Sequence, residues 1–151
     1  MATVRLAAEE NIPRILELYR QLVLTTSQVE LGKSPSLDDY QRVFAEICTF
    51  PRHEFLIAED EGEVVGTMVL LIVPNLSHSA LPWALVENLV VDKRYRRQGI
   101  GKLLLDYAIA RAKEAGCYRL VLSSDKRHRE AHKLYRSLGF EPSAYGFRLY
   151  F

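Results

Sequence analysis

Hydrophobic residues recur along this chain with two spacings, and these divide it into helices and strands. Apolar positions three or four residues apart lie on one face of a helix, whereas short runs rich in valine, leucine and isoleucine indicate strands. We expect helices at residues 12–23, 37–48, 99–115 and 128–138. We expect strands at residues 3–6, 54–59, 63–73, 83–91 and 118–123, and a final hairpin at 140–141 and 145–151.

The order of these elements is strand, two helices, three strands, helix, strand, helix and two strands. Because helical crossovers join only some of the strands, the order predicts an α/β fold with a mixed, mostly antiparallel sheet of six to seven strands. About four helices would flank this sheet. The chain has 151 residues, an ordinary length for one domain, so we expect residues 1–151 to form a single domain.

The composition is typical of a globular protein, with 48% hydrophobic and 26% charged residues. A formal net charge of +1 does not favour a nucleic acid as partner, because domains that bind nucleic acids are usually strongly basic. Neither a leader peptide nor an apolar run long enough for a bilayer is evident, so we expect a cytoplasmic protein without a membrane partner. Cys48 and Cys117 lack the spacing of a metal site or a disulfide framework.

The basic turn at residues 92–102 carries the clearest chemical signal, since it holds five Lys or Arg residues and two glycines before a helix. The first N–H groups of a helix attract anions, and glycine lets a ligand approach the backbone closely. The spacing of Gly99 and Gly101 and the presence of Leu103 exclude a P-loop, and Leu104 stands where a dinucleotide-binding motif needs its third glycine. The turn therefore predicts a site for a compact polyanion such as a pyrophosphate.

The pattern Arg96-x-x-Gly99-x-Gly101 after a strand resembles the acetyl-CoA signature of the GNAT N-acetyltransferases, and the order of the elements is similar to theirs. The resemblance implies an acetyl-CoA-dependent N-acetyltransferase. It implies that N–H groups of residues 97–102 hold the pyrophosphate and that the preceding strand pairs with the pantetheine arm. The implied cofactor-binding residues are Leu89, Val90, Val91, Arg96, Arg97, Gln98, Gly99, Ile100, Gly101, Lys102 and His128, the last replacing an Asn that is common in the family.

Two residues are candidates for catalysis. Glu87 is a carboxylate within an otherwise apolar strand, and a partly desolvated carboxylate is a stronger base, which suits it to take a proton from the amine. The other interpretation places Glu87 on the solvent face of the sheet or beside an Arg. The pattern Ala131-x-x-x-Tyr135-x-x-x-Gly139-Phe140 is similar to the last helix of the family, which implies that Tyr135 protonates the leaving thiolate; alternatively Tyr135 belongs to the core.

His128 and His132 are four residues apart, a spacing compatible with zinc. The H-E-x-x-H order is absent and no third ligand is evident, so we expect no metal. In the resembled family the first two helices and two loops choose the acceptor. Here these segments offer Tyr19, Arg20, Gln28, Glu30, Tyr40, Ser77, His78 and Ser79.

Residues 85–91 and 123–135 are similar to those of the aminoalkylphosphonate N-acetyltransferases, and residues 116–118 to those of glucosamine-phosphate N-acetyltransferases. Both resemblances imply a small primary amine with an anionic group. Our hypothesis is that Arg127 or Arg129 holds this anionic group. The alternatives are a protein or peptide acceptor, or a non-catalytic module that binds acyl-CoA. The aromatic residues of the final hairpin would suit a homodimer contact or the core; they are Tyr145, Phe147, Tyr150 and Phe151.

Overall fold

A single sheet organises the computed structural model, which describes residues 1–22 and 34–151. The strands lie in the order β1-β2-β3-β4-β5, and β1 to β4 pair antiparallel, whereas β5 runs parallel to β4. They are β1 (Thr3–Leu6), β2 (His53–Asp60), β3 (Glu63–Val73), β4 (Trp83–Val91) and β5 (Leu120–Leu122). The predicted α/β fold with a mixed, mostly antiparallel sheet is therefore confirmed.

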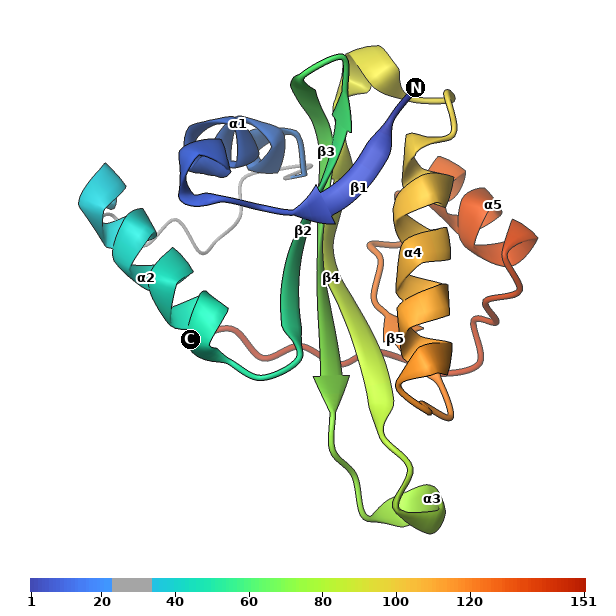
Figure 1. The fold of residues 1–151 in the computed structure, drawn as a ribbon. Helices are drawn as coiled ribbons and strands as arrows, with labels where there is room; N and C mark the ends of the chain where they lie inside the picture. Colours follow the sequence, from blue (N-terminus) through green and yellow to red (C-terminus); the bar gives the residue numbers. More distant parts are fainter. Residues whose placement is uncertain (23–33) are drawn as a thin grey trace.

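Helices cover both faces of the sheet, with α1 and α2 on one side and α4 and α5 on the other (Figure 1). The α-helices are α1 (Ile12–Leu22), α2 (Leu37–Thr49), α3 (Ser77–Ala80), α4 (Ile100–Glu114) and α5 (Arg129–Ser137). Two short 3-10 helices, η1 (Glu9–Asn11) and η2 (Lys93–Tyr95), precede α1 and α4. Among residues 1–22 and 34–151, the structure contains no helix with the length and apolar character that a membrane span requires.

Burial explains why the helical and strand patterns were so clear. The larger core lies between the sheet and α4, where Leu104 and Leu105 are fully buried against strand residues such as Met68. A smaller core lies under α1, where Leu18 packs with Ile57. Because β3 is covered on both faces, its sequence is an almost unbroken apolar run rather than an alternating one.

The predicted final hairpin is wrong, and with it the six- to seven-stranded sheet: the described residues form five strands. Residues 139–151 contain no regular secondary structure, and Figure 1 draws them as coil. The physical reason is at Pro142, which directly follows a predicted strand of only two residues and has no N–H to donate to a ladder. Tyr145, Phe147 and Phe151 are consequently exposed.

Candidate active site

The strands β4 and β5 stay paired for only a short distance. Val86 and Leu122 form the last of three parallel pairs. Within the described chain, the edge of β4 that faces β5 therefore has no strand partner at residues 87–91. An open edge of this kind offers backbone donors and acceptors to an extended ligand. It includes the predicted pantetheine-binding residues Leu89, Val90 and Val91.

A bulge in β4 marks the point where the strands part. Thr67 pairs with Val90 and Val69 pairs with Glu87, so two residues of β4 oppose one residue of β3. The extra residue is accommodated at Asn88, whose φ of +53° is left-handed. Because a bulge bends its strand and increases the twist, it separates the far end of β4 from β5.

Glu87 lies directly at this bulge, at the start of the open edge. Its side chain is exposed, so the partial desolvation that we expected from the apolar strand is not present in the structure. Val69 opposite Glu87 leaves the carboxylate without a charged cross-strand neighbour. Glu87 is thus accessible to a ligand in the gap, and its role as the base stays a prediction.

The side chain of Tyr19 on α1 lies beside the side chain of Asn88 at the same bulge. Burial raises the pKa of Tyr19 to about 12, so its hydroxyl stays protonated at neutral pH. Sequence reasoning placed Tyr19 only in a general polar wall and missed Asn88. The sequence signal for a bulge at this position was Asn88 itself, because Asn tolerates the left-handed conformation better than most residues.

The basic turn after β4 has the backbone geometry of an anion cradle. Arg97 and Gly99 both have left-handed backbone angles, with φ of +61° and +84°. Alternation of left-handed and right-handed residues makes successive N–H groups converge on one point. The N–H groups of Ile100, Gly101 and Lys102 belong to the first turn of α4 and have no acceptor within the helix. The residues present therefore fit a pyrophosphate group.

The two glycines of the turn are needed for different reasons. A Cβ at Gly99 would contact nothing within 4 Å, so this position needs glycine for its backbone angle. A Cβ at Gly101 would lie 3.1 Å from Cδ2 of Leu134 on α5. Gly101 therefore lets α5 pack closely on the start of α4.

Four exposed side chains of the turn have partners within the chain. Arg96 donates to the Val91 carbonyl at 3.2 Å, Gln98 donates to the Arg94 carbonyl at 3.3 Å, and Lys102 pairs with Asp106 on α4. Arg97 pairs with Glu130 of α5 at 3.1 Å. These contacts are exposed and individually weak, so the cations can exchange them for a phosphate. The side chain of Ile100 is buried in the core, so this residue offers only its backbone N–H.

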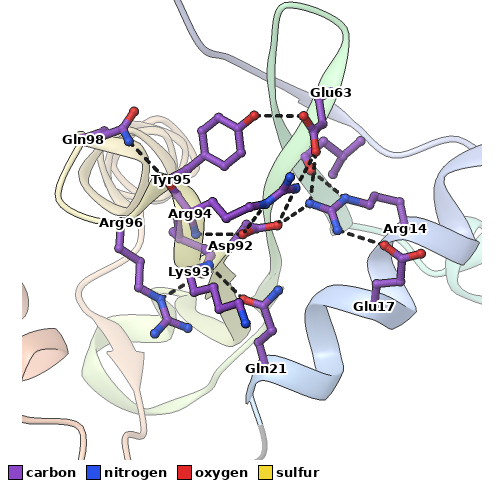
Figure 2. Close-up of polar contacts among 12 residues, drawn as sticks. Arg14, Glu17, Gln21, Glu63, Asp92, Lys93, Arg94, Tyr95, Arg96 and Gln98 are labelled. Atoms are coloured by element: carbon purple, nitrogen blue, oxygen red, sulfur yellow. Dashed lines mark hydrogen bonds and ion pairs between the residues drawn. The ribbon is translucent and has the colours of Figure 1, made fainter.

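A buried carboxylate anchors the turn from beneath (Figure 2). Asp92 is 1% exposed and accepts hydrogen bonds from the backbone and guanidinium of Arg94 and from the guanidinium of Arg14 on α1. These donors, Arg94 above all, hold the pKa of the Asp92 carboxyl well below its usual range. Glu63 accepts from Arg94 at 2.7 Å and from the Tyr95 hydroxyl at 2.8 Å. Together these contacts tie the cradle to β3 and α1.

A second contact joins α1 to the cradle. The backbone N–H of Lys93 donates to Oε1 of Gln21 at 2.8 Å (Figure 2). Sequence reasoning missed Arg14, Gln21 and Asp92 as parts of the site. The only signal was a single acid, Asp92, inside a basic turn directly after a buried strand.

Tyr135 on α5 lies at the gap rather than only in the core. Its ring is partly buried and packs against Phe140 with ring centroids 6.0 Å apart. Burial raises the pKa of its phenol, against the smaller, opposite effect of the neighbouring Ser124 side chain. Ser124 lies two residues past the last paired residue of β5, and Glu87 lies one residue past the last paired residue of β4. The two predicted catalytic residues therefore flank the same gap, although the structure contains no hydrogen bond between them within the described chain.

The remaining candidates are less clearly placed. His128 precedes α5 as its N-cap residue without a side-chain capping bond. The guanidinium of Arg127 donates to the Asp125 carboxylate at 2.8 and 3.0 Å, and the Arg127 backbone N–H donates to it at 2.9 Å. The loop with α3, which carries three predicted acceptor residues, lies at the end of the sheet opposite the cradle (Figure 1). Gln28 and Glu30 lie outside the described residues. Within the described ranges, no group of three or more His, Cys, Asp or Glu side chains could hold a metal ion.

Comparisons of sequence and of structure with known proteins both identify acetyltransferases. The model of the acetyltransferase (GNAT) family matches residues 13–140. A putative acetyltransferase from Agrobacterium tumefaciens has a similar structure, with a TM-score of 0.84, 31% identity, and coverage of 98% of this chain and 99% of that chain.

Three curated relatives differ in the acceptor that their names state. Aminoalkylphosphonate N-acetyltransferase of Salmonella typhimurium is 34% identical over 72% of each chain. Glucosamine 6-phosphate N-acetyltransferase of Trypanosoma brucei brucei is 32% identical over 52% of each chain, so this chain spans about half the length of that relative. Human N-alpha-acetyltransferase 30 is 31% identical over 97% of this chain but over 37% of its own length.

Proposed function

Because this chain belongs to the GNAT acetyltransferase family and is an acetyl-CoA-dependent acyltransferase, we propose that it acetylates the primary amine of a small, anionic metabolite. We include residues 1–151 in one catalytic domain. The cytoplasmic location, the homodimer and the lack of nucleic-acid or membrane partners stay predictions from the sequence.

The observation that carries the proposal is the gap between β4 and β5, with the cradle at one end and Glu87 and Tyr135 at its edges. In this arrangement the N–H groups of residues 97–102 bind the pyrophosphate, and the open edge of residues 89–91 pairs with the pantetheine arm. Acetyl-CoA supplies the acetyl group and a thiolate leaving group. Glu87 takes a proton from the amine, and Tyr135 gives its phenolic proton to the departing sulfur.

Two features favour a small anionic acceptor. The names of two relatives specify an amine that carries a phosphonate or phosphate group. In this chain Arg129 is an exposed cation at the first position of α5, where the positive end of the helix dipole adds to its charge. The Asp125 carboxylate offsets the charge of Arg127, so we assign the anion to Arg129.

The competing acceptor is a protein N-terminus. The similarity to N-alpha-acetyltransferase 30 supports it, because that match runs through 97% of this chain. A non-catalytic acyl-CoA-binding module would keep the cradle but would have no use for an exposed Glu87 at the open edge.

An amine panel with acetyl-CoA, with release of free thiol as readout, tests the proposal. The panel contains an aminoalkylphosphonate, glucosamine 6-phosphate, the same two amines without their anionic groups, and peptides with free N-termini. We expect turnover with an anionic amine and a higher KM for its uncharged counterpart. In the Arg129→Gln variant, the anionic amine and the same amine without its anionic group should have similar KM values. Turnover with peptides alone would refute the small-molecule acceptor, and binding of acetyl-CoA without turnover of any amine would favour the non-catalytic module.

A further inference from the structure

The side chain of Arg96 connects the cradle to the open edge of β4. Its Nε–H donates to the Val91 carbonyl at 3.2 Å, and Figure 2 shows this side chain beside the turn. Val91 is the last residue of β4 and, of the predicted contacts of the pantetheine arm, the one nearest to the cradle in the sequence. One side chain therefore joins the segment proposed for the pyrophosphate to the segment proposed for the arm.

The pairing of β4 with β3 shows which way the Val91 carbonyl points. Val91 lies opposite Gly66, but the hydrogen bond comes from the next residue: the N–H of Asp92 donates to the Val65 carbonyl at 2.9 Å. Val91 and Gly66 are thus a non-hydrogen-bonded pair, whose backbone groups point away from each other. The Val91 carbonyl faces the gap, where no strand of the described chain pairs with it. Arg96 covers an acceptor of the open edge.

The guanidinium of Arg96 differs from those of its neighbours in its lack of a carboxylate partner. Arg94, Arg97 and Lys102 each form an ion pair, whereas Arg96 forms none with residues 1–22 or 34–151. Its side chain is exposed, and the backbone of the turn is held separately by the buried Asp92. Arg96 can therefore leave the Val91 carbonyl by a change of rotamer, without a change in the turn.

We propose that Arg96 is a positioning residue that couples the two halves of the cofactor site. The inference rests on the proposed function, in which the cradle holds the pyrophosphate and residues 89–91 pair with the pantetheine arm. Arg96 leaves the Val91 carbonyl for a pyrophosphate in the cradle, because a hydrogen bond between two charged groups is stronger. The carbonyl is then open to an amide N–H of the arm. When the cradle holds no anion, Arg96 competes with the arm for the Val91 carbonyl.

This competition predicts an unusual sign for one substitution. Arg96→Met removes the charge and the donor but keeps a long, flexible side chain. It should weaken the binding of inorganic pyrophosphate and strengthen the binding of pantetheine about three- to tenfold, the range that one exposed hydrogen bond produces. A residue that only binds phosphate would leave the affinity for pantetheine unchanged. A residue that only stabilises the turn would lower both affinities when it is replaced.

Nuclear magnetic resonance titrations with these two fragments test the coupling. In the wild type, saturating pyrophosphate should lower the dissociation constant of pantetheine about three- to tenfold, since coupling between two sites is reciprocal. In Arg96→Met, pyrophosphate should not change it. Arg97→Met is the matched control, because it removes a cation of the same turn that pairs with Glu130 on α5 and not with the edge. It should weaken pyrophosphate binding but keep the coupling.

The chemical shift of the Val91 carbonyl carbon follows the hydrogen bond itself. Pyrophosphate should move this resonance in the wild type and in Arg97→Met toward its position in Arg96→Met. In Arg96→Met the resonance should not respond to pyrophosphate. A wild-type resonance that stays in place at saturating pyrophosphate would show that Arg96 keeps the carbonyl, and the coupling would be wrong.

Binding of whole CoA, measured by calorimetry, separates this inference from the function that it presupposes. If CoA binds the wild type but pantetheine affinity is equal in the wild type and Arg96→Met, undetectable binding included, the coupling alone fails. If CoA does not bind the wild type, the cofactor site fails and the proposed function fails with it.

Discussion

The substitution Asp92→Asn tests whether the buried carboxylate beneath the cradle stabilises the fold and anchors the basic turn. Asparagine has nearly the same shape and keeps an oxygen that can accept the backbone N–H of Arg94, now at 2.9 Å. Its amide nitrogen, however, would face the guanidinium groups of Arg14 and Arg94, so donor would meet donor. The substitution therefore removes one charge and one acceptor without opening a cavity.

The burial of the Asp92–Arg14 pair determines how much unfolding free energy Asp92→Asn should lose. The Asp92 side chain is 2% exposed and that of Arg14 is 23% exposed, so the pair is largely withdrawn from water. Loss of one partner from a buried ion pair costs about 3–5 kcal/mol, and we take the lower end because Arg14 keeps some contact with solvent. For a chain of 151 residues, about 3 kcal/mol lowers the Tm by roughly 6–12 °C.

Thermal and urea unfolding at neutral pH measure this loss, with Asp106→Asn as the control. Asp106 pairs with Lys102 on the surface and its side chain is 46% exposed, so the control should change the free energy of unfolding by less than about 1 kcal/mol. Acetyl-CoA affinity, measured where both proteins are folded, should fall only in Asp92→Asn because its cradle is no longer anchored. A loss of stability as small as that of Asp106→Asn would refute the reasoning.

The pH dependence gives a second, independent check on Asp92. Its folded-state pKa is lowered, so its contribution to stability is fully present above the unfolded pKa of about 4 and is lost as the pH falls toward the folded value. The difference in unfolding free energy between the wild type and Asp92→Asn should therefore shrink on acidification below about pH 4. A difference that stays constant in this range would mean that the carboxylate charge is not the stabilising feature.

Three further predictions concern single positions. Glu87→Gln should lower the rate of acetyl transfer at least about 100-fold with little change in acetyl-CoA affinity, because a general base acts on the amine and not on the cofactor; stopped-flow assays and calorimetry check the two parts. In urea unfolding, Gly101→Ala should cost about 1 kcal/mol of unfolding free energy because its Cβ would press on Leu134, and Leu134→Ala in the same chain should relieve that contact. The pKa of Tyr19 is raised to about 12, so the stability of the wild type relative to Tyr19→Phe should fall as the pH rises from about 10 toward 12 in urea unfolding.

The cradle was predictable from the sequence because its determinants are local. A buried strand, a left-handed Gly99 and the first turn of α4 lie within a few residues of one another, and each has its own signature in composition or spacing. The helix α4 was equally clear, since one of its faces is buried along its whole length. Local patterns of this kind are independent of how the rest of the chain folds.

The parts that were missed depend on contacts between distant segments. Arg14 meets Asp92 across 78 residues, and nothing near either residue indicates the other. The bulge at Asn88 shifts the register between two strands, which alternation of apolar residues does not reveal. The final hairpin predicted at residues 140–141 and 145–151 does not form, since β-favouring residues make a strand only where a partner strand is available.

The open edge of β4 exposes the protein to pairing with strands of other chains, and three features of the structure oppose such pairing. Unpaired backbone groups on a strand edge invite pairing with other chains. Here the edge is only five residues long, the bulge at Asn88 twists it, and Arg96 already occupies the Val91 carbonyl. Each of these features blocks a regular strand but leaves room for a thin, extended chain that needs few hydrogen bonds. In the proposed function, the same geometry that protects the edge would favour the pantetheine arm over another β-strand.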